Sequence, residues 1–130
     1  MELVERLPTA EEYVELLRRV GWTSLPIEDC QRALGGSLTA ICAVDERKAV
    51  VGMGRLVGDG RMYCFAVDVV VDPDAQGQGI GRGIMDALEA LATRRQLGTR
   101  LDLVAAPDVM PFYRRLGYSQ LPSGLMRKPL

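Results

Sequence analysis

The sequence predicts an α/β protein of 130 residues in which helices cover both faces of one sheet. Three observations favour this fold class. Segments with the apolar spacing of helices flank a run of strand-like segments between residues 38 and 71. A glycine-rich turn leads from the last of these strands into a further helix-like segment, and short helix- and strand-like segments follow. We therefore expect one domain, residues 1–130, with three α/β/α layers and a mixed, mostly antiparallel central sheet.

The N-terminal third is expected to form a short strand and two helices. Residues 3–6 are the strand, and Thr9 with Glu12 has the spacing of a capping box that starts a helix ending before Gly21. Acidic residues open the segment 26–34, apolar residues recur in it at helical spacing, and two glycines close it. This segment is therefore expected to be the second helix.

Three strands are expected in the middle of the chain, and polar or glycine-containing turns separate them. They span residues 38–44, 49–57 and 62–71 and should form an antiparallel meander. The third strand is almost entirely apolar, which is typical of a central strand that is covered on both faces.

The C-terminal half begins with the glycine-rich turn and should continue with two helices and three strands. The expected elements are a helix from Ile80 that Gly98 ends, a strand at 101–105, a short helix at 109–116 capped by Asp108, and strands at 118–121 and 125–128.

The composition excludes several kinds of chemistry. The chain has no histidine, which removes histidine-based nucleophile systems, histidine-ligated metals and a histidine base. A net charge of -1 shows no basic excess for nucleic acid, and no apolar run approaches the ~20 residues of a membrane span. Three widely spaced cysteines predict buried thiols in a reducing cytoplasm. We expect a cytoplasmic protein without a metal and without nucleic acid or membrane partners.

The densest chemical signal is the turn from Gln76 to Arg82, with the sequence QGQGIGR. Its glycines permit positive φ and let a ligand approach the free N–H groups at the start of a helix. The two glutamines add neutral donors and the arginine adds a positive charge, so a diphosphate is the expected ligand. The dinucleotide fingerprint and the P-loop both fail here. A turn that uses glycine only for packing is the alternative, and the four glycines between 77 and 83 make it the weaker one.

The residues around this turn resemble a known family. The segment 69–82, VVVDPDAQGQGIGR, is similar to the acetyl-CoA signature of the GCN5-related N-acetyltransferase (GNAT) superfamily. Residues 112–118, FYRRLGY, resemble the F-Y-x-x-L-G-F segment of that family, and residues 51–55, VGMGR, resemble one of its strands. The chain departs from the family at Ala106, where many members have an asparagine that contacts the pantetheine arm.

The resemblance implies a GNAT-like fold and the transfer of an acetyl group from acetyl-CoA to a primary amine of a small molecule, by direct attack within a ternary complex. Tyr113 matches the family tyrosine that protonates the departing thiolate. Trp22, Tyr13 and Tyr63 are expected to line the acceptor pocket, and a homodimer is expected because members often pair. The residues expected to bind the cofactor are Val69, Val70, Val71, Gln76, Gly77, Gln78, Gly79, Ile80, Gly81 and Arg82.

Several alternatives stay open at this point. Without histidine, the base that deprotonates the amine is Asp68, a water chain or bulk solvent. Asp68 is explained equally well as a buried structural acceptor or salt-bridge partner, and substrate anchoring is a third role. Tyr113 is alternatively a packing residue, and a backbone N–H of Val69 or Val70 would polarise the acetyl carbonyl if a bulge frees it. The alternative functions are a CoA-binding regulatory module without transfer activity and a protein N-terminal or lysine acetyltransferase.

Overall fold

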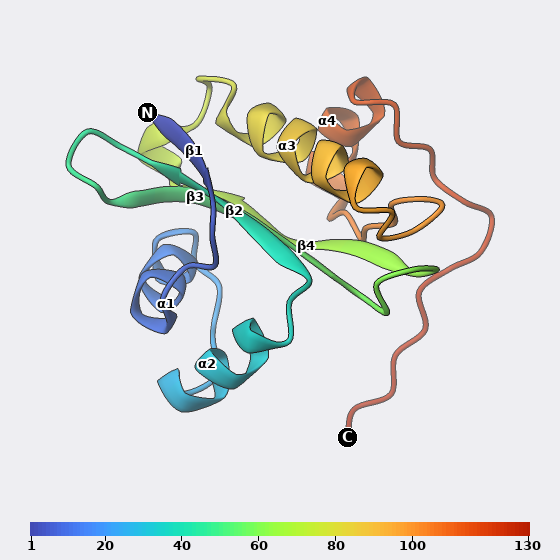
Figure 1. Ribbon diagram of the computed structural model, residues 1–130, viewed down its shortest axis with the longest axis horizontal. Coiled ribbons are helices and arrows are strands. Elements are labelled where there is room, and N and C mark those ends of the chain that lie inside the picture. The colour runs from blue at the N-terminus through green and yellow to red at the C-terminus, as the bar shows by residue number, and fades with distance from the viewer.

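The computed structural model describes residues 1–130 and has a four-stranded antiparallel sheet between two layers of helices (Figure 1). The strands, in their order across the sheet, are β1 (Glu2–Glu5), β2 (Thr39–Val44), β3 (Val50–Gly58) and β4 (Cys64–Val71). The helices are α1 (Ala10–Arg19), α2 (Ile27–Gly35), α3 (Ile80–Arg94) and α4 (Met110–Arg115). Helices α1 and α2 lie on one side of the sheet and α3 and α4 on the other, which confirms the predicted α/β fold.

Helix α1 begins with the capping box that its sequence predicts. The Thr9 hydroxyl accepts the Glu12 N–H at 3.1 Å, and the Thr9 N–H donates to Glu12 Oε1 at 2.8 Å. Arg6 donates two further hydrogen bonds to the same carboxylate, at 2.8 and 3.0 Å. One carboxylate therefore joins the end of β1 to the start of α1 and fixes the direction in which the helix leaves the sheet.

Two apolar layers hold the helices to the sheet. On the α3 side, Ile84 and Leu88 are fully buried and lie directly on β3. This approach is close because Gly54 has no side chain: a Cβ atom there would stand 2.8 Å from Ile84 Cγ2 and 2.9 Å from Leu88 Cδ1. On the other side, Leu16 of α1 packs with Met53 of β3. The neighbouring residues Met53 and Gly54 of β3 thus face opposite sides of the sheet, as the two-residue period of a strand requires.

Strand β4 lies at the edge of the sheet, and the prediction that residues 62–71 form its central strand is wrong. One parallel bridge continues the sheet beyond β4. The Asp102 N–H donates to the Cys64 carbonyl at 3.0 Å, and the Ala66 N–H donates to the Asp102 carbonyl at 2.9 Å. From residue 67 onward, the outer edge of β4 has no strand partner.

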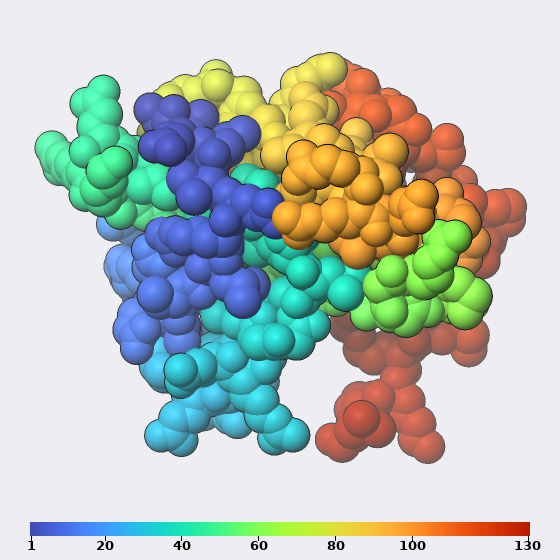
Figure 2. Space-filling view, viewed as in Figure 1, coloured from blue at the N-terminus to red at the C-terminus, as the bar shows by residue number.

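The strands predicted at 101–105, 118–121 and 125–128 do not form. The first is reduced to the single bridge at Asp102, and the other two belong to a C-terminal segment without regular structure. Apolar alternation predicts an extended backbone, but a strand also needs a partner edge in register, which depends on the tertiary structure. Figure 2 shows that the C-terminal end stands away from the body of the protein, with open space between it and α2.

Two helix boundaries also differ from the prediction. Helix α3 ends at Arg94 rather than near Gly98, because Gln96 adopts a left-handed conformation with φ of 54° and closes the helix as a C-terminal glycine would. Asp108 does not cap α4 and lies instead within a short 3-10 turn, Pro107–Val109. None of the helices combines the length and the apolarity that a membrane crossing requires.

Candidate active site

The glycine turn, residues 76–82, links β4 to α3 and leaves a row of backbone donors free. Gly77 and Gly79 adopt the left-handed conformation, with φ of 80° and 79°, and a Cβ atom at either position would meet nothing within 4 Å. The N–H groups from Gly77 to Arg82 donate no hydrogen bond within the protein. Together with the positive end of the α3 dipole, they form an anion site with the donor chemistry that a diphosphate needs.

Other residues of the glycine turn have different tasks. The Gln76 side chain donates to the Val71 carbonyl at 3.1 Å and ties the end of β4 to the turn. Gly81 lies beside Phe112 of α4, at a distance where an added Cβ atom would make an ordinary contact of 3.4 Å with that ring. Arg82 is exposed, and its ion pair within α3 is long, at 3.8 Å. The sequence predicts that the whole turn binds the ligand. In the structure, the backbone from Gly77 to Arg82 offers free N–H groups, whereas the Gln76 side chain binds the end of β4 and Gly81 contacts α4.

A bulge interrupts β4 on the way to the glycine turn. The register shifts between Met53 and Arg55 of β3, so β4 carries one residue more than β3 at this point. Asp68 lies in the bulge with φ of 52°, a left-handed conformation that aspartate adopts more readily than most residues. The predicted role of Val69 or Val70 toward an acetyl carbonyl requires such a bulge, and the bulge is present.

The remaining residues predicted to bind the cofactor divide between the surface and the core. Gln78 is exposed, whereas Ile80 is buried and anchors the first turn of α3. On β4, Val69 and Val71 pack toward α3, and Val70 packs toward α1. The unpaired edge of β4 and the glycine turn therefore form one continuous stretch of backbone, and the individual contacts with a cofactor stay predictions.

Asp68 is at the centre of a polar network on the α1 side of the sheet. The Tyr13 hydroxyl and Arg55 Nε each donate to Asp68 Oδ2 at 2.8 Å, and Arg55 Nη1 donates to the Ser37 hydroxyl at 2.9 Å. Asp68 Oδ1 receives no hydrogen bond from the protein and is open to solvent. Burial, together with the Asp68 carboxylate, raises the pKa of Tyr13 to about 12. Two donors from different elements therefore fix the position of this carboxylate.

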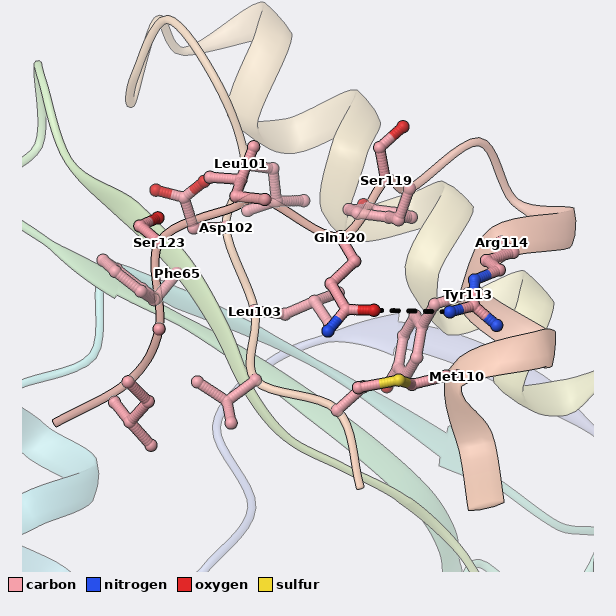
Figure 3. A pocket seen from close by; sticks show the side chains of 16 residues that line it. Phe65, Leu101, Asp102, Leu103, Met110, Tyr113, Arg114, Ser119, Gln120 and Ser123 are labelled. Carbon is pink, nitrogen blue, oxygen red and sulfur yellow. Dashed lines mark hydrogen bonds between the residues drawn. The ribbon is translucent and has the colours of Figure 1, made fainter. Parts of the chain in front are cut away.

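Tyr113 lines a pocket of about 480 Å³ that lies between β4, residues 101–105 and the C-terminal segment. Tyr113 and Met110 of α4 lie on one side of the pocket and Phe65 of β4 on the other, with Gln120 between them (Figure 3). The Tyr113 hydroxyl makes no hydrogen bond within the protein and is not buried. Partial burial raises the pKa of this phenol. The phenol is therefore protonated at neutral pH and open to a ligand.

Neighbouring rings fix the orientation of Tyr113. Phe112 and Tyr118 meet its ring edge-on, with centroids 5.0 and 5.9 Å away. The Tyr118 hydroxyl donates to Glu89 Oε1 of α3 at 2.6 Å, which fixes the second of these rings in turn. Because Phe112 also lies against Gly81, one short helix connects the glycine turn with the pocket.

The structure does not bring Trp22 or Tyr63 to this pocket. Their side chains are 51% and 52% exposed, and neither residue lines the pocket. Asp68 is not part of the lining either. The sequence does not identify Arg55 and Ser37 as members of the polar network around Asp68, although the position of Arg55 indicates that it needs a partner. It is the one charged residue in an otherwise apolar and glycine-containing strand, and a charge in such a strand needs a partner.

Comparison with known proteins decides the family. Residues 37–120 match the family model described as an acetyltransferase (GNAT) domain. The chain belongs to the GNAT family. The resemblance that the sequence motifs carry is thereby confirmed, and the protein is an acetyl-CoA-dependent acyltransferase of this family.

Both a solved structure and sequence relatives are similar to this GNAT protein. The GNAT family acetyltransferase SP0256 from Streptococcus pneumoniae TIGR4 superposes with a TM-score of 0.82 and 32% identity, covering 98% of this chain and 97% of that chain. Serotonin N-acetyltransferase 2, chloroplastic, of Oryza sativa subsp. japonica is 34% identical over 116 residues, which cover 85% of this chain and 56% of that protein. Histone acetyltransferase TAP1 of Glycine max is 31% identical over 120 residues, with 85% and 52% covered. The chain thus spans about half the length of the two plant relatives.

Proposed function

We propose that this GNAT protein moves the acetyl group of acetyl-CoA to the primary amine of a small molecule, by direct attack within a ternary complex. The observation that carries the proposal is the row of free N–H groups from Gly77 to Arg82, next to the unpaired edge of β4. A diphosphate fits this donor set. Side chains at Gly77 or Gly79 would occupy the same open space, which explains why glycine is needed at both positions.

Each group of residues has a role in this reaction. Bound acetyl-CoA supplies an activated acetyl thioester. The glycine turn binds the diphosphate, and the edge from Val69 to Val71 offers backbone groups to the pantetheine arm. A backbone N–H in the bulge stabilises the negative charge that develops on the carbonyl oxygen. Tyr113 donates its proton to the departing sulfur as a C–N bond replaces the C–S bond, and the proton of the amine passes to Asp68 or to solvent.

The pocket beside Tyr113 supports a small-molecule acceptor. Its volume is about 480 Å³, and ligand pockets span roughly 300–1,000 Å³. Apolar side chains such as Phe65, Leu103 and Met110 contribute most of its lining. The rice relative is named for a small aromatic amine, which supports the same class of acceptor. The soybean relative is named for histones, and this observation favours a protein acceptor as the second candidate.

A free-thiol release assay with acetyl-CoA tests this function. The acceptors to compare are arylalkylamines, aminosugars, amino acids and basic peptides. We expect turnover with small amines and no turnover above background with peptides. Turnover with peptides alone would favour the protein acceptor, and the absence of turnover with every acceptor would overturn the proposed transfer.

Binding of acetyl-CoA at the glycine turn is measured separately by thermal unfolding. At about 100 times its Kd, a ligand stabilises a protein by about 2.7 kcal/mol, so acetyl-CoA should raise the Tm by several degrees. Gly79→Trp should abolish this increase. Gly21→Trp is the matched control, because Gly21 has φ of 78° and equally open surroundings but follows α1. An increase that persists in Gly79→Trp, or disappears in both variants, would remove the glycine turn as the binding site.

A further inference from the structure

The carboxylate of Asp68 is held by several elements of the fold, and one of its oxygens is left without a partner. Both protein donors, Tyr13 of α1 and Arg55 of β3, reach Oδ2 at 2.8 Å. Ser37, which follows α2, accepts a second hydrogen bond from Arg55 at 2.9 Å. The side chains of Arg55 and Asp68 are only 13% and 20% exposed, so this arrangement is built into the fold and is not a solvated surface pair. Oδ1 has no donor in the protein and is accessible.

Asp68 also lies where a second substrate can approach the reacting edge. Val69 and Val71 face α3, whose N-terminus carries the glycine turn, whereas Asp68 faces α1 through its bond to Tyr13. We expect the acceptor's amino group on the α1 side of this edge, where Asp68 lies, and the rest of the acceptor in the pocket beside Tyr113, whose lining includes Phe65 of the same strand. No strand covers the edge of β4 from residue 67 onward, so the two sides meet there.

We propose that Asp68 Oδ1 accepts a hydrogen bond from the amino group of the acceptor, that Arg55 and Tyr13 are positioning residues for this carboxylate, and that solvent takes the proton of the amine. The inference rests on the proposed function and names its substrate class. The acceptor is an alkylamine that is cationic at neutral pH and has no carboxylate beside its amino group. A fixed, charged oxygen attracts an ammonium group and repels a neighbouring carboxylate. Oδ1 is then occupied by the amino group that it anchors, so the proton of the amine passes to solvent.

The test compares an alkylamine with the amino acid that has the same side chain, in the unmodified protein and in Asp68→Asn. We expect Asp68→Asn to raise the KM of the alkylamine about tenfold, because a hydrogen bond to a charged group is lost, while the KM of acetyl-CoA changes less than about twofold. The ratio of kcat/KM for the alkylamine to kcat/KM for the amino acid should be smaller in Asp68→Asn than in the unmodified protein. The rise of kcat/KM toward alkaline pH should persist, since the amine itself loses the proton that causes the rise.

Two further variants complete the design. Tyr13→Phe keeps the ion pair of Asp68 and removes one hydrogen bond, so it tests the network even where Asp68→Asn fails to fold. It should raise the KM of the alkylamine about threefold. Glu46→Gln is the matched control, because it removes an exposed carboxylate in the turn between β2 and β3, and it should change neither KM.

Several outcomes would overturn the inference. An unchanged KM in both network variants would make the network purely structural. If Asp68→Asn lowered kcat about 100-fold and also abolished the rise of kcat/KM toward alkaline pH, Asp68 would be the base. If the unmodified protein acetylates no amine, calorimetry of the alkylamine with CoA-saturated protein separates the two proposals. Binding that Asp68→Asn abolishes would then support the anchor and overturn the transfer, whereas no binding would overturn both.

Discussion

Among the single residues, Tyr113 combines a raised pKa with a hydroxyl that has no partner in the protein. Burial raises its pKa above the ordinary value of 10.0, while its hydroxyl has no partner in the protein and stays open to the pocket. A phenol of this kind keeps its proton until a thiolate, with a solution pKa of ~8.5, is formed beside it. Because the pKa is raised, ionisation of Tyr113 should reduce activity only in strongly alkaline solution, above about pH 10.

Removal of the Tyr113 hydroxyl is the direct test of its role. We expect Tyr113→Phe to lower kcat by about 100-fold, as the loss of a general acid does, and to change the Kd of acetyl-CoA by less than about twofold. The ring contacts with Phe112 and Tyr118 are kept and no hydrogen bond is lost, so the Tm should be unchanged. Steady-state kinetics and calorimetry measure these quantities. An undiminished kcat would return Tyr113 to a packing role.

Among the elements, the corner between β1 and α1 depends on one ionised carboxylate. The hydrogen bonds of the Arg6 guanidinium, supported by the Thr9 N–H, lower the pKa of Glu12 from 4.5 to about 2. Because the pKa is lower in the folded than in the unfolded protein, the ionised group stabilises the fold at neutral pH. That contribution is fully present above pH 4.5 and is lost as the pH falls toward about 2.

Glu12→Gln should therefore destabilise the protein in a pH-dependent way. The free energy of unfolding is expected to fall by about 1 kcal/mol at neutral pH, where the ion pair with Arg6 is lost while the glutamine keeps the capping-box acceptor, and by much less in acid. Urea unfolding at neutral pH and at about pH 3 measures the difference. Glu11→Gln, an exposed neighbour in the same first turn, is the control and should have a smaller effect at neutral pH. An equal loss at both pH values would contradict the role of the ionised pair.

In the molecule as a whole, no cysteine or histidine is placed to carry the acetyl group between two half-reactions. All three cysteines are buried, and burial raises the pKa of Cys42 to about 11 and also raises the pKa of Cys64. Histidine is absent. The glycine turn leads into α3 on one side of the sheet and the Asp68 carboxylate faces α1 on the other, so the sites proposed for the two substrates do not overlap.

This arrangement predicts the kinetic order of the reaction. Double-reciprocal plots of initial rate should intersect, as they do for a ternary complex, because a covalent acetyl-enzyme would instead give parallel lines. Mass spectrometry after incubation with acetyl-CoA alone should find no acetylated protein. Parallel lines would show a covalent acetyl-enzyme, and an acetyl group on a cysteine would show that a buried thiol becomes accessible during turnover.

The sequence by itself determined the order of the elements through α3, the capped start of α1 and the left-handed glycines of the turn. These features depend on residues close together in the chain. Thr9 and Glu12 are three residues apart and cap the helix between them, and Gly77 and Gly79 lack the Cβ atom that would oppose positive φ. The resemblance of residues 112–118 to a family segment singles out Tyr113, whereas its place beside the pocket depends on how α4 packs against distant parts of the chain.

Only the tertiary structure decided which strands find partners and which polar groups meet. Residues 101–105 have the alternation of a strand, yet one residue pairs, because pairing needs an edge that a distant part of the chain supplies. Tyr13 and Asp68 are 55 positions apart, and no local pattern connects them. The packing of α1 over β3 and β4 brings the phenol of Tyr13 and the guanidinium of Arg55 to one carboxylate oxygen and leaves the other free for a ligand.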